Sequence, residues 1–237
     1  MIATEQVLAE IAKHAEAEYP KECCGLVVVR KGRQRYMPVR NIAENANAHF
    51  IMDPTEQAAA EDEGEIVMVV HSHPNIPPTP SQADLIGCET SGVPWLIINW
   101  PTGATHTFEP TGYVPPLYGR EFVHGVLDCY SFLQGYYQQE LGIVLPNFDR
   151  SEQWWLKGDN LYMEGFSKTD FAIVHDTPKQ HDAFFMCIGS PVPNHAAVYL
   201  GEGLIGHHET RRLSSRDVYG GWYQKITTHT LRHKRFL

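Results

Sequence analysis

The sequence predicts an α+β protein built of two domains, residues 1–112 and 117–237. Apolar residues recur at helical spacing in some segments and form short β-branched runs in others. Between them, residues 110–116 combine three prolines with a glycine, as expected of a linker. The charge balance also changes there, from 7 Lys and Arg against 15 Asp and Glu in residues 1–115 to 12 against 13 in residues 116–237. Each half, at ~115 residues, can bury its own core.

In the first half, the pattern predicts alternating helices and strands. The chain opens with a helix that Thr4 can cap, because the apolar residues that follow recur every three or four positions. A buried strand is expected at residues 25–30, and a turn leads to a return strand near residues 35–40. A helix is expected at residues 54–63 and a central strand at residues 66–70. Another helix is expected from Ser81, and another strand at residues 95–100.

In the second half, the clearest element is a helix at residues 129–141. Asp128 can cap its start and Gly142 can end it. Strands are expected at residues 183–187 and 196–200, with a glycine-rich turn after the second. Residues 146–177 are aromatic and irregular, and their pattern supports no assignment.

Composition and charge narrow the classes of protein. With 43% hydrophobic and 20% charged residues the chain is typical of a globular protein. No basic patch is present, so nucleic acid is not an expected partner. No signal peptide is visible, and no run approaches the ~18 apolar residues of a membrane span. The five cysteines are odd in number and two are adjacent, so a disulfide framework is not expected and we expect synthesis in a reducing cytoplasm.

A candidate metal site follows the apolar strand of residues 66–70. His71 and His73 are two residues apart, so in a strand their imidazoles point to one face. Ser81 lies eight residues beyond His73, and Asp84 lies one helical turn further. Two histidines and a carboxylate suit a hydrolytic zinc shell, which leaves a fourth position for water. Ser81 to Asp84 can also be read as a capping box that needs no metal.

Metal-assisted hydrolysis also needs a group that moves protons. Glu22, at the start of the first strand, is the acid that we assign to this role. Together these residues resemble the JAMM (JAB/MPN) metallopeptidase family over about residues 1–110. The resemblance implies a JAB/MPN-like mixed sheet with flanking helices and cleavage of amide or isopeptide bonds. It further implies Zn²⁺ held by His71, His73 and Asp84, with Glu22 as general acid and base and Ser81 stabilising an oxyanion.

A candidate nucleophile lies in the second half. Cys129 occupies the first turn of the predicted helix, where unpaired N–H groups and the helix dipole favour a thiolate. His207 lies 12 residues beyond His195. If the turn between them closes a hairpin, one histidine can act as base while the other orients it. A buried cysteine is also commonly a small apolar side chain, and 13 histidines make chance pairs easy to find. The ordered combination favours catalysis.

This half resembles the NlpC/P60 cysteine peptidases, which have a papain-like fold and typically cut cell-wall peptides. The motifs are Asp128-Cys129-Tyr130-Ser131-Phe132, Asp182-Ala-Phe-Phe, and Asn194-His195-Ala-Ala-Val-Tyr-Leu-Gly followed by His207. The resemblance implies Cys129 as nucleophile, His195 as base and His207 as the orienting residue, for which His208 is the competitor. Many members carry a tyrosine where this chain has Phe122, which leaves the substrate open.

The two domains in this order resemble the tail tip assembly proteins of lambda-like bacteriophages. The resemblance implies other tail tip proteins as partners, and peptidoglycan peptides or a protein as substrate. It also implies a protein that is made in the host cytoplasm, reaches the virion tail tip and acts in the host periplasm on infection. Two hypotheses follow, a wall-cleaving enzyme and a mainly structural assembly factor. A bacterial deconjugating peptidase is a third, although it would not need the second half.

Overall fold

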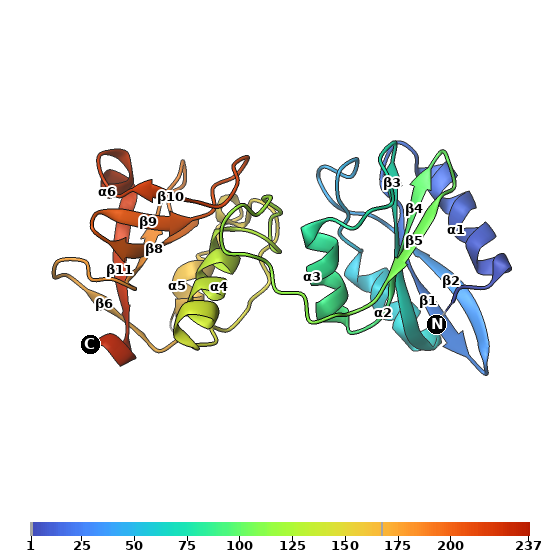
Figure 1. Cartoon of the computed structure of the whole chain (residues 1–237), viewed down its shortest axis with the longest axis horizontal. Coiled ribbons are helices and arrows are strands. Elements are labelled where there is room, and N and C mark those ends of the chain that lie inside the picture. The colour runs from blue at the N-terminus through green and yellow to red at the C-terminus, as the bar shows by residue number, and fades with distance from the viewer. Residues whose placement is uncertain (1, 167) are drawn as a thin grey trace. The chain divides into compact units, whose positions relative to one another are not determined.

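The chain forms two compact units in the computed structural model, Met1–Val114 and Pro115–Leu237 (Figure 1). The structure describes residues 2–166 and 168–237. No helix within these described ranges is long and apolar enough to cross a membrane. Each unit contains one sheet and its own buried apolar core.

The first unit is built on a five-stranded mixed sheet. Its strands are arranged in the order β2-β1-β3-β4-β5. The two inner strands β3 and β4 run parallel, and every other pair is antiparallel. The strands are β1 Cys24–Arg30, β2 Arg33–Val39, β3 Glu65–Pro74, β4 Trp95–Trp100 and β5 Thr105–Phe108.

Three helices cover the two faces of this sheet. Helix α1 (Glu5–Glu18) buries its apolar stripe of Val7, Ile11 and Ala15 against one face. Helices α2 (Pro54–Glu63) and α3 (Gln82–Ser91) pack on the other face. Thr4 caps α1 and Ser81 caps α3, because their hydroxyls accept backbone N–H groups of the first turn.

The second unit holds a six-stranded antiparallel sheet in the order β10-β9-β8-β7-β11-β6. Its main helix is α4 (Cys129–Leu141), which packs on the sheet through Phe132, Leu133 and Tyr137. The strands are β6 Phe171–Val174, β7 Ala183–Met186, β8 His195–Gly201, β9 Leu204–His207, β10 Ser215–Val218 and β11 Thr227–His233. The short helices are η1 Trp154–Leu156, α5 Leu161–Phe166, α6 Trp222–Ile226 and η2 Lys234–Phe236.

Two differences from the sequence expectations affect the sites. The central strand does not end at residue 70, because β3 continues to Pro74 and carries both His71 and His73 within it. The segment at residues 146–177, which gave no pattern, contains η1, α5 and β6. Its order depends on aromatic packing against the core, as for Trp154 and Tyr162, and such contacts leave no periodicity in the sequence.

Candidate functional site

Strand β3 and the start of α3 bring the predicted metal ligands together. His71 and His73 alternate with Ser72 on β3, so both rings leave the same face of the sheet. Asp84 is the third residue of α3, in a reciprocal capping box with Ser81. Gly87 lets the helix approach closely, because a Cβ there would overlap the ring of Trp95.

The distances within this cluster match those of a small tetrahedral site. Nε2 of His71 lies 3.1 Å from Nε2 of His73 and 3.3 Å from Oδ1 of Asp84. Nε2 of His73 lies 3.6 Å from Oδ2 of Asp84. Ligands bound tetrahedrally to zinc at 2.0–2.1 Å would be roughly 3.3 Å apart. Two imidazole nitrogens and one carboxylate therefore fit a zinc ion that keeps one position open.

Hydrogen bonds around His73 set the direction of its ring. Nδ1 of His73 lies 3.0 Å from the carbonyl oxygen of Pro77. A carbonyl only accepts, so Nδ1 carries the proton and Nε2 presents its lone pair to the cluster. The amide of Asn99 donates to the carbonyls of His73 and Ile76, at 3.2 and 2.6 Å, and holds this loop. Asn99 was not predicted from the sequence, and the parallel register places it opposite His73 on β4.

The charges of the cluster are mutually stabilising. Burial opposes ionisation of Asp84, but the adjacent imidazoles of His71 and His73 hold its pKa well below the usual range. Burial lowers the pKa of His71. For His73 the effect of burial is outweighed by the carboxylate of Asp84 and the carbonyl of Pro77, so its pKa is raised. An anionic Asp84 and a neutral His71 are the protonation states that a metal requires.

Glu22 is buried two residues before β1, close enough to the cluster to interact electrostatically with His73 and Asp84. Desolvation raises the pKa of its carboxyl to about 8. Two hydrogen bonds hold the backbone of Glu22. Its N–H donates to the carbonyl of Ala46 at 2.7 Å, and the side-chain amide of Asn41 donates to the carbonyl of Glu22 at 3.0 Å. A carboxyl whose pKa lies near neutrality can both take and give a proton.

Ser81 stands at the rim of the same cluster. Its hydroxyl accepts the N–H of Asp84 at 3.1 Å, and its own N–H donates to Oδ2 of Asp84 at 2.7 Å. The capping box considered as an alternative to a metal site is thus present, and it is compatible with one because it fixes the carboxylate beside the two imidazoles. The catalytic role of Ser81 stays a prediction.

In the second unit, Cys129 is the first residue of α4. Asp128 caps the helix in a capping box with Ser131. The guanidinium of Arg150 donates to both oxygens of Asp128, at 2.8 and 3.4 Å. Burial disfavours the charge on Asp128, but Arg150 holds its pKa below the usual range. Arg150 belongs to the segment that gave no sequence pattern, so its part in the site was missed.

Two histidines and an aspartate form a hydrogen-bonded chain beside the cysteine. Antiparallel pairing of β8 and β9 places Nε2 of His195 at 2.9 Å from Nδ1 of His207. Nε2 of His207 lies 2.8 Å from Oδ2 of Asp217 on β10. Asp217 was missed in the sequence analysis. The alternation of residues 215–218 could have indicated a third strand beside the hairpin, with Asp217 on the face of His207.

This chain of contacts selects one tautomer for each ring. A carboxylate only accepts, so Nε2 of His207 carries a proton and donates it to Asp217. Nδ1 of His207 must then accept, and Nε2 of His195 donates to it. His195 is left with a lone pair on Nδ1. That is the tautomer a general base needs, and Asp217 fixes it through His207.

Cys129 and His195 line one cavity, which has room of about 140 Å³. Sγ of Cys129 lies 3.0 Å from the hydroxyl of Tyr162 and 4.0 Å from the carbonyl of Asn194. Within residues 2–166 and 168–237, no hydrogen bond joins Sγ to His195. Burial raises the pKa of Cys129 to about 11 and lowers that of His195 to about 3. The pair therefore rests as neutral thiol and neutral imidazole.

His208 takes a different position from His207. Its buried ring lies edge-on to Phe122, with the ring centroids 5.2 Å apart, and both residues line the cysteine cavity. Burial lowers the pKa of His208 to about 4. His195 is hydrogen-bonded to His207 and not to His208, so the geometry favours His207 over His208 for the orienting role.

Comparison with known proteins assigns both units to families. A model of the prokaryotic homologues of the JAB domain matches residues 4–109, and a model of the NlpC/P60 family matches residues 119–232. These matches confirm the predicted α+β fold, with a JAB/MPN-like domain followed by an NlpC/P60 domain.

Two relatives match both domains, and both are named tail tip assembly protein K. The protein of Escherichia phage N15 is 36% identical over 232 residues, which cover 97% of this chain and 95% of that protein. The protein of Escherichia phage lambda is 39% identical over 184 residues, covering 77% and 89%. A desampylase of Pyrococcus furiosus is 38% identical over 85 residues, covering 33% of this chain and 59% of that protein.

Proposed function

Because this chain belongs to the family of phage tail tip assembly protein K, we propose that it is a tail tip peptidase that cleaves peptide bonds of bacterial peptidoglycan. The observation that carries the proposal is the chain of hydrogen bonds from His195 through His207 to Asp217, beside a cysteine at a helix N-terminus. This arrangement prepares a general base next to a nucleophile.

The residues of the second unit account for each bond that changes. His195 takes the proton of Cys129, and Sγ attacks the carbonyl carbon of the peptide bond. The C–N bond then breaks as His195 gives its proton to the leaving amine, which leaves a thioester on Cys129. A water molecule, deprotonated by His195, hydrolyses the thioester and restores the thiol. His207 and Asp217 hold the ring of His195 and stabilise it while it is charged.

The first unit is proposed to be a zinc-dependent amide or isopeptide hydrolase. His71, His73 and Asp84 would hold the metal, and their separations support this assignment. When bound, zinc supplies Lewis-acid chemistry at the scissile carbonyl. Glu22 moves a proton from the attacking water to the leaving amine, for which a pKa of about 8 is suited. Ser81 is proposed to stabilise the developing oxyanion with its hydroxyl hydrogen.

The site of action follows from the family. We infer synthesis in the host cytoplasm, contact with other tail tip proteins during assembly, and action of the cysteine site in the host periplasm on infection. Delivery by a virion would bring a wall-cleaving enzyme to its substrate.

The test measures zinc content and muropeptide cleavage by the full-length protein and by Cys129→Ala. We expect about one zinc per chain in both, since the ligands lie in the other unit. Cleavage should occur in the wild type and be lost in Cys129→Ala. Zinc-free protein that cleaves nothing would refute both assignments. Cleavage that survives the substitution would move the activity away from Cys129.

A second candidate function is a mainly structural role in tail assembly. It is favoured by one observation, which is that the buried thiol of Cys129 has no hydrogen bond to His195 among the described residues. Separate Cys129→Ala and His71→Ala phages, scored for tail assembly and for infectivity, distinguish the two functions. Normal assembly with lost infectivity favours the enzyme. If neither change affects either readout, the protein acts through its folds alone.

A further inference from the structure

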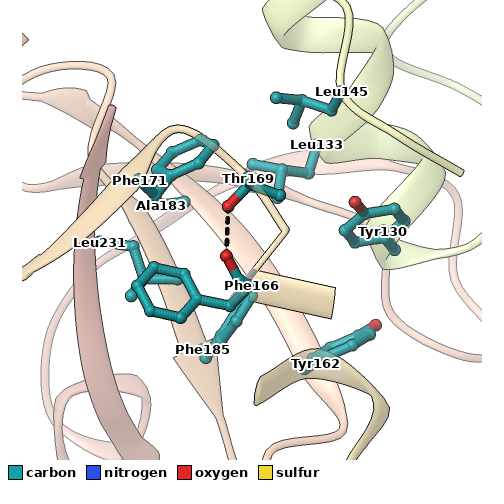
Figure 2. A pocket seen from close by; sticks show the side chains of 10 residues that line it. All are labelled: Tyr130, Leu133, Leu145, Tyr162, Phe166, Thr169, Phe171, Ala183, Phe185 and Leu231. Carbon is teal, nitrogen blue, oxygen red and sulfur yellow. Dashed lines mark hydrogen bonds between the residues drawn. The ribbon is translucent and has the colours of Figure 1, made fainter. Parts of the chain in front are cut away.

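Tyr162 of α5 lines two cavities of the second unit. One is the cysteine cavity described above, and the other is an apolar cavity between α4, α5 and the sheet. Figure 2 shows Tyr162 and Tyr130 at one side of this apolar cavity, whose central polar contact joins the Thr169 hydroxyl to the Phe166 carbonyl at 2.7 Å. The hydroxyl of Tyr162 instead lies 3.0 Å from Sγ of Cys129.

Resting on the function proposed for the cysteine site, we propose that Tyr162 is a further catalytic residue. Its hydroxyl donates a hydrogen bond to Sγ of Cys129 and stabilises the thiolate once His195 has taken the proton. The covalent bonds that form and break are those described above, because Tyr162 keeps its proton throughout.

The direction of this hydrogen bond follows from the chemistry of the two groups. A phenol is a good donor, whereas a thiol is a weak one. Burial raises the pKa of Tyr162 well above its usual value, so the hydroxyl remains protonated and able to donate. The thiol hydrogen can point to the carbonyl of Asn194, at 4.0 Å from Sγ. When that hydrogen leaves, the bond from Tyr162 becomes charge-assisted and stronger.

Packing fixes the hydroxyl of Tyr162 in place. Its ring centroid lies 5.3 Å from that of Trp154 and 5.0 Å from that of Phe185. A donor that is held before the charge forms has little to reorganise during the reaction. The apolar cavity behind the ring has room of about 20 Å³, roughly one water molecule. The hydroxyl has its partner in the thiol and not in that cavity.

The neighbouring aromatic residues do not offer a hydroxyl group to Sγ of Cys129. Tyr130 donates its hydroxyl to the carbonyl of Pro146 at 2.8 Å. Phe122 lines the cysteine cavity but has no hydroxyl. Tyr130 therefore offers a matched control, since Tyr130→Phe and Tyr162→Phe each remove one buried hydroxyl from adjacent rings.

The test follows alkylation of Cys129 by iodoacetamide against pH in the full-length protein, with the Cys129 peptide quantified by mass spectrometry. In Tyr162→Phe we expect the alkylation profile to move up by about one pH unit, so that the rate at a fixed pH falls about tenfold. The same variant should lose kcat for muropeptide cleavage with an unchanged KM. Tyr130→Phe should leave the alkylation profile in place.

The outcomes separate this inference from the proposed function. A shifted alkylation profile without cleavage by the wild type would support the role of Tyr162 and refute peptidoglycan as the substrate. Wild-type cleavage, with alkylation and kcat unchanged in Tyr162→Phe, would overturn the role of Tyr162 alone. Equal shifts in both tyrosine variants would show a loss of packing and also overturn it. A wild-type thiol that stays unreactive at every pH would refute both.

Discussion

The two candidate sites of this protein differ in how far apart their residues lie in the chain. In the first unit, the three candidate metal ligands fall within residues 71–84, on one strand and the helix after it, and Glu22 joins them from a distant segment. In the second unit, the participating residues are spread over residues 128–217 and come from α4, α5 and three strands of the sheet. A local site can be found by its spacing, whereas a dispersed site depends on tertiary packing that spacing does not encode.

The largest effect is expected at the local site, where one substitution removes the only anionic ligand of the predicted zinc shell. Asp84→Asn preserves the shape but removes the charge, so zinc affinity should fall more than about 100-fold, since even loss of outer-shell partners costs 10–100-fold. Zinc content after dialysis against a weak chelator measures this change. Asp62→Asn, an exposed acid on α2, is the control and should retain zinc. Full zinc content in Asp84→Asn would contradict the ligand set.

At the dispersed site, the corresponding change removes the end of the hydrogen-bonded chain. In Asp217→Asn the side-chain amide can donate to His207, which would disturb the tautomers of both rings. We expect kcat for muropeptide cleavage to fall about 10- to 100-fold, less than for a direct partner of the base. Zinc content should not change, because the ligands lie in the other unit. The exposed Asp159→Asn is the control, and equal activity in both variants would remove Asp217 from the site.

These two sites also show how much of the structure could be predicted from the sequence. The clustering of the candidate ligands His71, His73 and Asp84 could be predicted because a strand and a capped helix convert short spacings into one geometry. The pair His195 and His207 was found because a glycine turn predicts a hairpin. Helix α4 was predicted with its bounds as observed, because its cap, its periodicity and its terminal glycine agree.

The residues that escaped prediction share a physical reason. Arg150 and Tyr162 lie in a segment without hydrophobic periodicity, whose path is set by aromatic rings such as Trp154 packing into the core. Asn99 and Asp217 reach their sites through strand pairing with distant segments. Nothing in the local pattern distinguishes these polar residues from solvated ones.

The buried ion pair between Arg150 and Asp128 should stabilise the second unit. Replacing Arg150 by Met leaves Asp128 buried without its partner, which typically costs about 3–5 kcal/mol. Hydrogen exchange followed by mass spectrometry should show faster exchange across the second unit and unchanged exchange in the first. Arg211→Met, at a more exposed arginine, is the control. Unchanged protection of α4 in Arg150→Met would show that the ion pair does not stabilise this unit.

The same ion pair predicts a loss of stability in acid. The pKa of Asp128 is lower in the folded protein than in the unfolded chain, where it is ~3.9. The pair therefore stabilises the fold above that unfolded value, and the stabilisation is lost as the pH falls through the lower folded value. The wild type should lose this contribution on acidification, and Arg150→Met should not.

The smallest expected effect comes from the buried histidines of the second unit. His208 has a folded pKa of about 4, below the ~6.5 of an unfolded histidine, because burial penalises its charged form. Below roughly pH 6.5 the unfolded chain binds a proton that folded His208 does not, so stability falls by up to ~1.4 kcal/mol per pH unit until the folded value is reached. His208→Gln should reduce the slope of the unfolding free energy against pH by the contribution of one bound proton, as measured by urea unfolding at several pH values. His175→Gln, at an exposed histidine, is the matched control. An equal slope in wild type and His208→Gln would mean that His208 is protonated in the folded protein, and its ring would then place a positive charge in the cysteine cavity.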